Sequence, residues 1–320
     1  MHAFKILFLT LTLNVGAGCD TEVTDDAGNG VSVRRSGSGG YGGVWLNTSA
    51  IGSQPFSEID LTGKLHDGVQ VTGGQVKGPN NTWITVTKTE IADGTLRVKT
   101  GKGDVVGAAL VGARWQVKLV DEQGVAVPRE LWITAVNVIS AKETRYTFQT
   151  HDDDGQVMYV CDADAMGSHA AAVIKDVTID PDTADMATRK DTVYFACVSG
   201  AVGKAVTWGY RPWERSLSEF SNAVRVVRAD YCHDGMSWTE TGTAIQVKDR
   251  WNINTFLSTS EATEAVWTKT GIACLVKPRN PVFTAPQVTC DGKAIPTCPA
   301  NVSMSTHSDT QFWTKAAPQL

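Results

Sequence analysis

Residues 82–100, "TWITVTKTEIADGTLRVKT", indicate the fold class. Apolar and polar side chains alternate on both sides of a central "ADG", the period-two pattern of a half-buried strand. Similar runs follow in "RWQVKLVDEQG" (114–124) and "ELWITAVNVI" (130–139). The Gly, Asn and Asp residues between the runs favour turns. The segment 44–150 is therefore predicted to be a β-rich domain, an antiparallel sandwich or a barrel-like sheet.

The composition is that of an ordinary globular protein. Of 320 residues, 42% are hydrophobic and 20% are charged, so the chain can bury a sizeable core. The formal net charge is −5 and no basic run is present. A mildly acidic chain of this kind argues against a nucleic-acid partner.

The first residues have the features of an export signal. An apolar run at Ile6–Leu13 is too short to span a membrane, so residues 1–18 are predicted to be a cleaved signal peptide. "GAGC" ending at Cys19 resembles the bacterial lipoprotein signal, in which the Cys is lipidated. An ordinary signal cut near Ala17 is the alternative. Residues 19–43 are then the lipidated Cys and a flexible tether rich in Gly, Ser and Asp.

The cysteine count supports lipidation. Seven cysteines occur, and removing Cys19 leaves an even number, which suggests three disulfides among fifteen possible connectivities. No C-x-x-C motif is present, which weakens a zinc or thioredoxin-like reading. The expected bonds, chosen for a short loop and simple nesting, are Cys290–Cys298, Cys161–Cys197 and Cys232–Cys274.

Residues 151–320 are predicted to form a second, disulfide-stapled β-rich module of α+β type. One helix is expected near 216–230, because Ser216 and Glu219 make a capping box ahead of apolar residues at helical spacing. "WTETGTAIQVK" (238–248) and "WTKTGIACLVK" (267–277) are similar, and each predicts a hairpin that turns at Thr-Gly.

Three stretches of this module resemble a known family. They are "YFACVSGAVGKAVTWGYRPW" (194–213), "VRADYCHDG" (227–235) and "EAVWTKTGIACLVKPR" (264–279). Together they resemble the ADYC domain of predicted lipoproteins and secreted proteins, named for a tetrapeptide that stands here at 229–232. The resemblance implies an exported, disulfide-rich domain and no particular activity.

Relatives of this kind usually have Cys at two positions where this chain has Ala205 and Ala223. Joint loss of both residues is what a disulfide pair would show, which favours a structural role for the cysteines.

The adjacent residues Cys232, His233 and Asp234 form the sharpest candidate for catalysis. A thiolate nucleophile needs a His within hydrogen-bond reach, but neighbouring residues in a turn usually point in different directions. We therefore expect a structural disulfide. "GMSWT" (235–239) lacks the final Gly of a nucleophile elbow, and no H-E-x-x-H motif occurs.

Two weaker candidates are binding sites. Asp152 and Asp154 in "THDDDG" resemble part of a calcium loop, although Thr150 occupies the first ligand position and a solvated acidic turn is the alternative. Calcium is the one cofactor considered. Trp208, Tyr210 and Trp213 are candidates for a binding platform, with a core position as the alternative.

The sequence favours an exported, lipid-anchored protein that binds or supports other components of the bacterial cell envelope without catalysis. We expect it to face the periplasm or sit at the outer membrane, held to the membrane through Cys19. An envelope protein or a glycan would be its partner. The alternative is a secreted hydrolase whose site is assembled from dispersed Asp and His residues.

Overall fold

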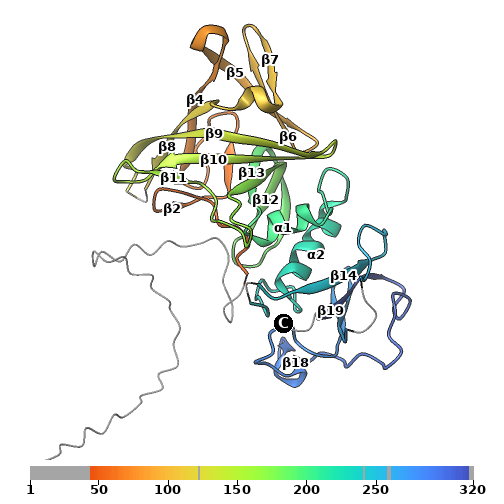
Figure 1. The fold of residues 1–320 in the computed structure, drawn as a ribbon. Coiled ribbons are helices and arrows are strands. Elements are labelled where there is room, and N and C mark those ends of the chain that lie inside the picture. Colours follow the sequence, from red (N-terminus) through yellow and green to blue (C-terminus); the bar gives the residue numbers. More distant parts are fainter. Residues whose placement is uncertain (1–43, 122, 241, 258–260, 317–320) are drawn as a thin grey trace, which may run out of the picture. The chain divides into compact units, whose positions relative to one another are not determined.

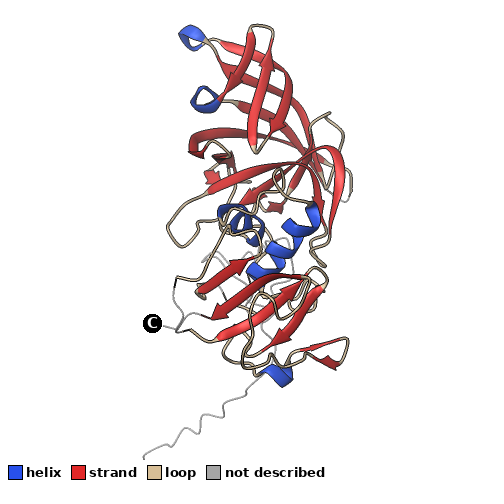
Figure 2. Ribbon diagram, turned by 90° about the vertical axis from the view of Figure 1, so that its right-hand side faces the viewer, coloured by secondary structure: helices blue, strands red, loops and turns tan. Residues whose placement is uncertain are grey.

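The computed structural model describes residues 44–121, 123–240, 242–257 and 261–316 (Figures 1 and 2). The mostly β fold predicted from the sequence is confirmed, with several antiparallel sheets and two α-helices in this part of the chain. No helix among these residues is long and apolar enough to cross a membrane. The predicted signal peptide, Cys19 and the tether lie outside the described residues.

The largest sheet has eleven strands. It contains the two strands predicted in residues 82–100 and those predicted in 114–124 and 130–139. Neighbouring strands pair antiparallel, which suits the alternating burial that the sequence predicted. In spatial order the strands are β3 (Glu58–Asp60), β13 (Met186–Cys197), β12 (Ala170–Ile179), β10 (Glu143–His151), β9 (Ala126–Ser140), β8 (Arg114–Val120), β4 (Val69–Lys77), β5 (Trp83–Ala92), β6 (Thr95–Thr100) and β7 (Gly103–Val106), with β11 (Val157–Tyr159) paired to β10.

A smaller sheet contains the last long strand of the chain. Its order is β14 (Ile245–Asp249), β19 (Thr310–Ala316), β15 (Thr263–Thr268) and β16 (Gly271–Leu275). Two short hairpins are β1 (Ala50–Ile51) with β2 (Gln54–Pro55), and β17 (Thr289–Cys290) with β18 (Lys293–Ala294). Short 3-10 helices are η1 (Pro79–Asn81), η2 (Gly107–Leu110) and η3 (Ala285–Gln287).

The predicted helix is confirmed as α2 (Leu217–Arg228). Ser216 accepts a hydrogen bond from the Glu219 N–H, and the Glu219 side chain accepts one from the Ser216 N–H, so the capping box is complete. A shorter helix, α1 (Ala201–Thr207), was not predicted. It has no side-chain cap, so the sequence carries no start signal for it.

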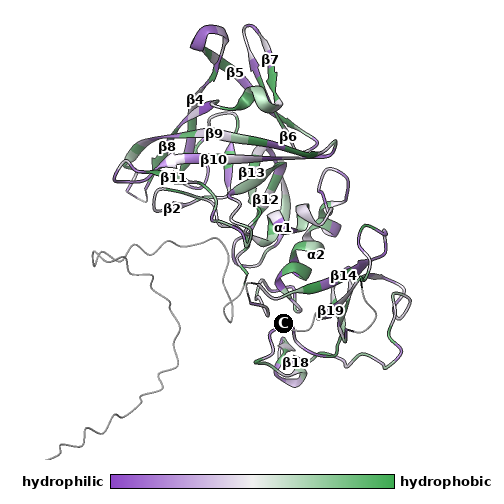
Figure 3. Cartoon of the chain, in the orientation of Figure 1, coloured by the Kyte–Doolittle hydropathy of each residue, from purple (hydrophilic) through white to green (hydrophobic). Residues whose placement is uncertain are grey.

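Strand β12 and residues 192–197 of β13 are largely buried on both faces. Val173 and Phe195 belong to a core inside the large sheet, whereas Ile174 and Tyr194 belong to a second core with α1, α2 and the small sheet. Period-two alternation therefore assigns successive residues of one strand to two different cores. This explains the mostly apolar sequence of β12 and of residues 193–197, and much of β12 and α2 is green in Figure 3.

The domain boundary predicted near Thr150 falls in β10. This strand pairs with β9 on one side and with β12 and β11 on the other, so one sheet contains residues from both proposed segments. The division into two domains stays a prediction.

The similar segments at 238–248 and 267–277 differ in structure. The second forms the β15–β16 hairpin as predicted. Among the described residues of the first segment only β14 is a strand, and it pairs with β19. The reason is Trp238, whose N–H donates to the Arg228 carbonyl and whose own carbonyl accepts from Asn280. Its ring is buried in the core, so the segment before β14 runs inward and does not pair.

Three disulfides join the six cysteines that the structure describes, and one predicted pairing is confirmed. Cys161 is bonded to Cys197 as expected. The predicted bonds Cys232–Cys274 and Cys290–Cys298 are wrong.

The other two bonds are Cys232–Cys290 and Cys274–Cys298. The simple nesting assumed from the sequence fails because the chain after the β17–β18 hairpin returns alongside β16. There Leu275 bridges to Thr297, and the Cys298 N–H donates to the Leu275 carbonyl. Cys298 is thereby placed beside Cys274, and Cys290 bonds to Cys232, which follows the end of α2.

Candidate functional site

The residues after α2 form a closely hydrogen-bonded turn. Ala229 ends the helix in the left-handed conformation, with φ 52°. Asp230 is fully buried and its carboxylate accepts the N–H groups of Asp234 and Gly235, each at 3.1 Å. It also pairs with the Arg225 guanidinium from the last turn of α2. The carboxylate therefore fixes the turn to the helix that precedes it.

Tyr231 holds a buried ion pair. Its hydroxyl donates to Glu264 at 2.9 Å and accepts the Arg279 N–H at 2.8 Å. Glu264 and Arg279 form an ion pair of 3.1 Å whose side chains are 0% and 1% exposed. The Tyr231 ring stacks on Trp267 with centroids 5.3 Å apart. The tyrosine thus links α2, β15 and the segment that follows β16.

Cys232, His233 and Asp234 do not form a nucleophilic site. Cys232 is bonded to Cys290, so the structural role expected for it is confirmed. His233 has φ 58°, and the Asp234 carboxylate accepts the Met236 N–H at 2.9 Å within the same turn. Gly235 ends the motif with φ 85°, and a Cβ at this position would overlap the Asp182 carbonyl oxygen. Only glycine fits there.

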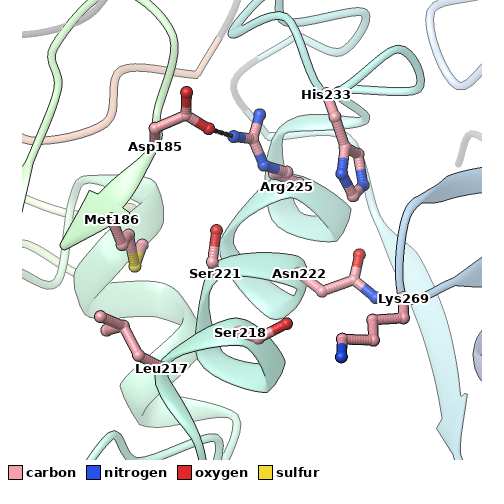
Figure 4. A pocket seen from close by; sticks show the side chains of 9 residues that line it. All are labelled: Asp185, Met186, Leu217, Ser218, Ser221, Asn222, Arg225, His233 and Lys269. Carbon is pink, nitrogen blue, oxygen red and sulfur yellow. Dashed lines mark hydrogen bonds and ion pairs between the residues drawn. The ribbon is translucent and has the colours of Figure 1, made fainter.

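A pocket of about 280 Å³ lies beside this turn, between α2, the start of β13 and the β15–β16 turn (Figure 4). Most of its lining groups are polar or charged. They are Asp185, Met186, Leu217, Ser218, Ser221, Asn222, Arg225, His233 and Lys269. A pocket of this size accommodates a small molecule or the end of a longer one.

Two cations give the pocket its charge. Arg225 is 4% exposed and pairs with Asp185 at 2.7 Å, as the dashed line in Figure 4 marks, and with Asp230 behind it. Lys269 is exposed and forms no salt bridge among the described residues. Burial raises the pKa of the Asp230 carboxyl to about 6, while the Arg225 charge and hydrogen bond oppose that rise.

His233 is neutral at ordinary pH. Burial, followed by the nearby Arg225 charge, lowers the pKa of its imidazole to about 4. An imidazole with so low a pKa is a weak general base. It is therefore suited to neutral hydrogen bonding.

Two buried polar atoms at this pocket lack hydrogen-bond partners among the described residues: Asn222 Oδ1 and His233 Nε2. The Asn222 amide is oriented by its Nδ2 group, which donates to the Thr268 carbonyl at 2.8 Å and to Gln311 at 2.6 Å. Because both donor positions are used, Oδ1 is a free acceptor. Unpartnered buried groups of this kind are uncommon and costly.

The predicted aromatic platform does not form one surface. Tyr210 is 1% exposed, donates its hydroxyl to Asp249 at 2.8 Å and packs edge-on against Phe312. Trp208 packs against the same core at the end of α1. Trp213 donates to the Lys142 carbonyl and covers the turn between β5 and β6. The alternative interpretation, aromatic side chains used in packing, describes all three residues, since Trp213 also packs against this core.

Asp152 and Asp154 lie in the turn between β10 and β11. Asp152 Oδ1 accepts the N–H groups of Asp154 and Gln156 at 3.0 and 2.7 Å, the pattern of an acidic turn. The one three-residue group of possible metal ligands among the described residues lies elsewhere. A calcium role for the two residues stays a prediction.

Sequence reasoning did not find Asn222, Lys269 or Asp185 as site residues. Asn222 gave little signal, because helical spacing places it opposite Phe220, on the polar face that also carries Ser218 and Arg225. Lys269 and Asp185 gave none, since only the tertiary structure brings their segments beside α2.

Comparison with protein families finds the ADYC domain over residues 107–281, more than half of the chain. This range contains the turn after α2 and every residue that lines the pocket. No curated protein and no solved structure matches the chain.

Proposed function

The chain belongs to the ADYC domain family, and we propose that it is a lipid-anchored envelope protein that binds a small acidic saccharide without catalysis. Its three disulfides suggest an extracellular or periplasmic location. The lipid anchor is a finer proposal, which rests on the lipoprotein-like signal that ends at Cys19.

The single observation that carries the binding proposal is unmet hydrogen-bonding capacity beside the pocket. Asn222 Oδ1 accepts nothing and His233 Nε2 has no partner, although both residues line the pocket. Both atoms are covered in the structure, so a ligand reaches them after a small movement of the lining side chains. A ligand hydroxyl that met them would recover the cost of leaving buried polar atoms unpaired.

An acidic saccharide matches the remaining groups. Its hydroxyls suit Asn222, Ser218 and Ser221, and its carboxylate suits Lys269, the exposed cation of the pocket. No Phe, Tyr or Trp side chain lines the pocket among the described residues, which argues against an apolar ligand.

Hydrolysis is the less favoured function. A catalytic serine needs a base within hydrogen-bond reach, and His233 Nε2 has no partner among the described residues. Asp230 has the raised pKa that a catalytic acid uses, but it does not line the pocket and already binds Arg225 and two backbone N–H groups. It is better suited to hold the turn.

Calorimetry with uronic-acid oligosaccharides and neutral oligosaccharides tests the binding proposal. We expect saturable binding of the acidic set, weakened about fivefold by Lys269→Ala, the effect of one exposed charge contact. Lys293→Ala in the β18 hairpin is the matched control and should bind like the parent. Absence of binding, or equal binding by Lys269→Ala and the parent, would refute the proposal.

Cell fractionation tests the anchor. The parent should be in the detergent-soluble membrane fraction, whereas Cys19→Ser should be released or remain unprocessed. Equal membrane association of both proteins would exclude lipidation at Cys19.

A further inference from the structure

A second cluster of ligand-type side chains, none of which lines the pocket, lies at the β3 edge of the large sheet. Glu58 comes from β3, and His66 and Asp67 come from the turn that enters β4. The ligand atoms of these three residues all lie within 4.8 Å of one another. Two antiparallel hydrogen bonds between His66 and Val69 hold this turn.

The distances suit a bound metal ion. Both carboxylates approach the same imidazole nitrogen: His66 Nε2 is 2.9 Å from Glu58 Oε2 and 3.4 Å from Asp67 Oδ2. Two ligand atoms bound at about 2.0–2.1 Å to a tetrahedral zinc ion lie about 3.3 Å apart. We propose that Glu58, His66 and Asp67 bind a divalent cation, preferentially Zn²⁺, with water as the fourth ligand.

The two buried ligands are already oriented. Glu58 is 2% exposed, and its second oxygen, Oε1, accepts the Ile179 N–H at 2.9 Å. Carboxylate ligands in metal sites are commonly held by such a bond. Oε2 thus remains directed at His66, which is 7% exposed.

Charge favours the cation. The cluster places two carboxylates beside one imidazole, and the Glu58 carboxylate is buried. A divalent ion offsets the charge of the two carboxylates, and an imidazole that binds it through Nε2 keeps its own proton on Nδ1. One nitrogen and carboxylate oxygens form a ligand set that zinc accepts.

Asp67 provides the route for the ion. Its side chain is 64% exposed, so an ion meets this carboxylate first and then reaches the two buried ligands. Bound there, the ion would join β3 to the start of β4. None of the three residues lines the pocket, so the proposed site does not rest on the proposed function.

Calorimetry of the untagged, fully oxidised protein with ZnCl₂ tests the site, because the six described cysteines are then in disulfides. We expect one Zn²⁺ per chain and a rise in melting temperature on binding. Co²⁺ in place of Zn²⁺ should give the visible absorption of a four-coordinate ion. Glu58→Gln and His66→Gln should each weaken binding at least about tenfold.

Asp67→Asn keeps the proposal testable if the buried variants fail to fold, because the residue is exposed and Asn tolerates its φ of 46°. It too should weaken Zn²⁺ binding. Asp93→Asn is the matched control: it lies in another Asp-Gly turn with φ 49° and should bind like the parent. Zn²⁺ binding that is absent, or equal in the Asp67→Asn and Asp93→Asn proteins, would overturn the proposal.

Discussion

Removal of the bond between Cys232 and Cys290 should destabilise the protein by about 4 kcal/mol. The bond closes a segment with a sequence separation of 58, and chain entropy for such a loop gives that figure. The Cys274–Cys298 bond, with a separation of 24, gives about 3.5 kcal/mol by the same relation. Since the two loops overlap, removing both bonds should cost less than the sum of the two effects.

The assay is urea unfolding of the oxidised proteins, followed by tryptophan fluorescence. Cys232→Ala, Cys290→Ala and the double variant should lose the same free energy of unfolding within error, because each lacks the same bond. As a control, the loss of unfolding free energy on removing the Cys161–Cys197 bond should add to the loss on removing the Cys232–Cys290 bond. If Cys232→Ala instead matched Cys274→Ala in such a cycle, the pairing described above would be refuted.

Three further substitutions test the turn after α2. Tyr231→Phe should cost about 2 kcal/mol in urea unfolding, because it removes a buried hydrogen bond to the Glu264 carboxylate. His233→Asn should change how the free energy of unfolding depends on pH. The lowered pKa of His233 makes the parent lose stability as pH falls from about 6.5 to about 4. The difference in unfolding free energy between parent and variant should therefore shrink by about 1.4 kcal/mol per pH unit over that range. Gly235→Ala should cost at least about 2 kcal/mol more than Gly242→Ala in the same assay, since both have φ near 90° but only the first meets neighbouring backbone.

Each of these three has an outcome that contradicts it. A Tyr231→Phe protein as stable as the parent would mean that the hydroxyl does not support the ion pair. Parallel stability curves for His233→Asn and the parent between pH 4 and 6.5 would mean that the folded protein does not lower the pKa of this imidazole. Equal losses of stability on placing alanine at the two glycines would mean that the Asp182 backbone does not exclude a side chain at position 235.

The strands and the long helix could be predicted because their signals are local. Alternation in β5, β6, β8 and β9 follows from burial of one face. The start of α2 follows from Ser216 and Glu219, three residues apart. These features depend on neighbours within a few positions, which a single sequence displays.

The disulfide pairing and the first hairpin could not be predicted because they depend on distant segments. Cys298 meets Cys274 only because residues 295–298 return beside β16. Trp238 turns inward only because the end of α2 and Asn280 bind its backbone. Neither contact can be recognised from the residues that are nearby in the sequence.

The candidate sites show the same limit. The pocket needs α2, the start of β13 and the β15–β16 turn together, so its residues are scattered between 185 and 269. Glu58 and His66 stand only eight residues apart, yet their spacing matches no known metal motif. The turn between them, in which the Gly63 N–H donates to the Asp60 carbonyl, is what lets the two side chains come into contact.

The crossed order of the last two disulfides has a consequence for how the chain matures. If oxidation proceeds as the protein emerges N-terminus first, Cys232 meets Cys274 before either true partner arrives. That early bond must be broken by thiol–disulfide exchange once Cys290 and Cys298 are present. We therefore expect the yield of correctly oxidised protein to depend on a disulfide isomerase in the producing cell, and a chain that ends before Cys290 to remain trapped with the wrong bond.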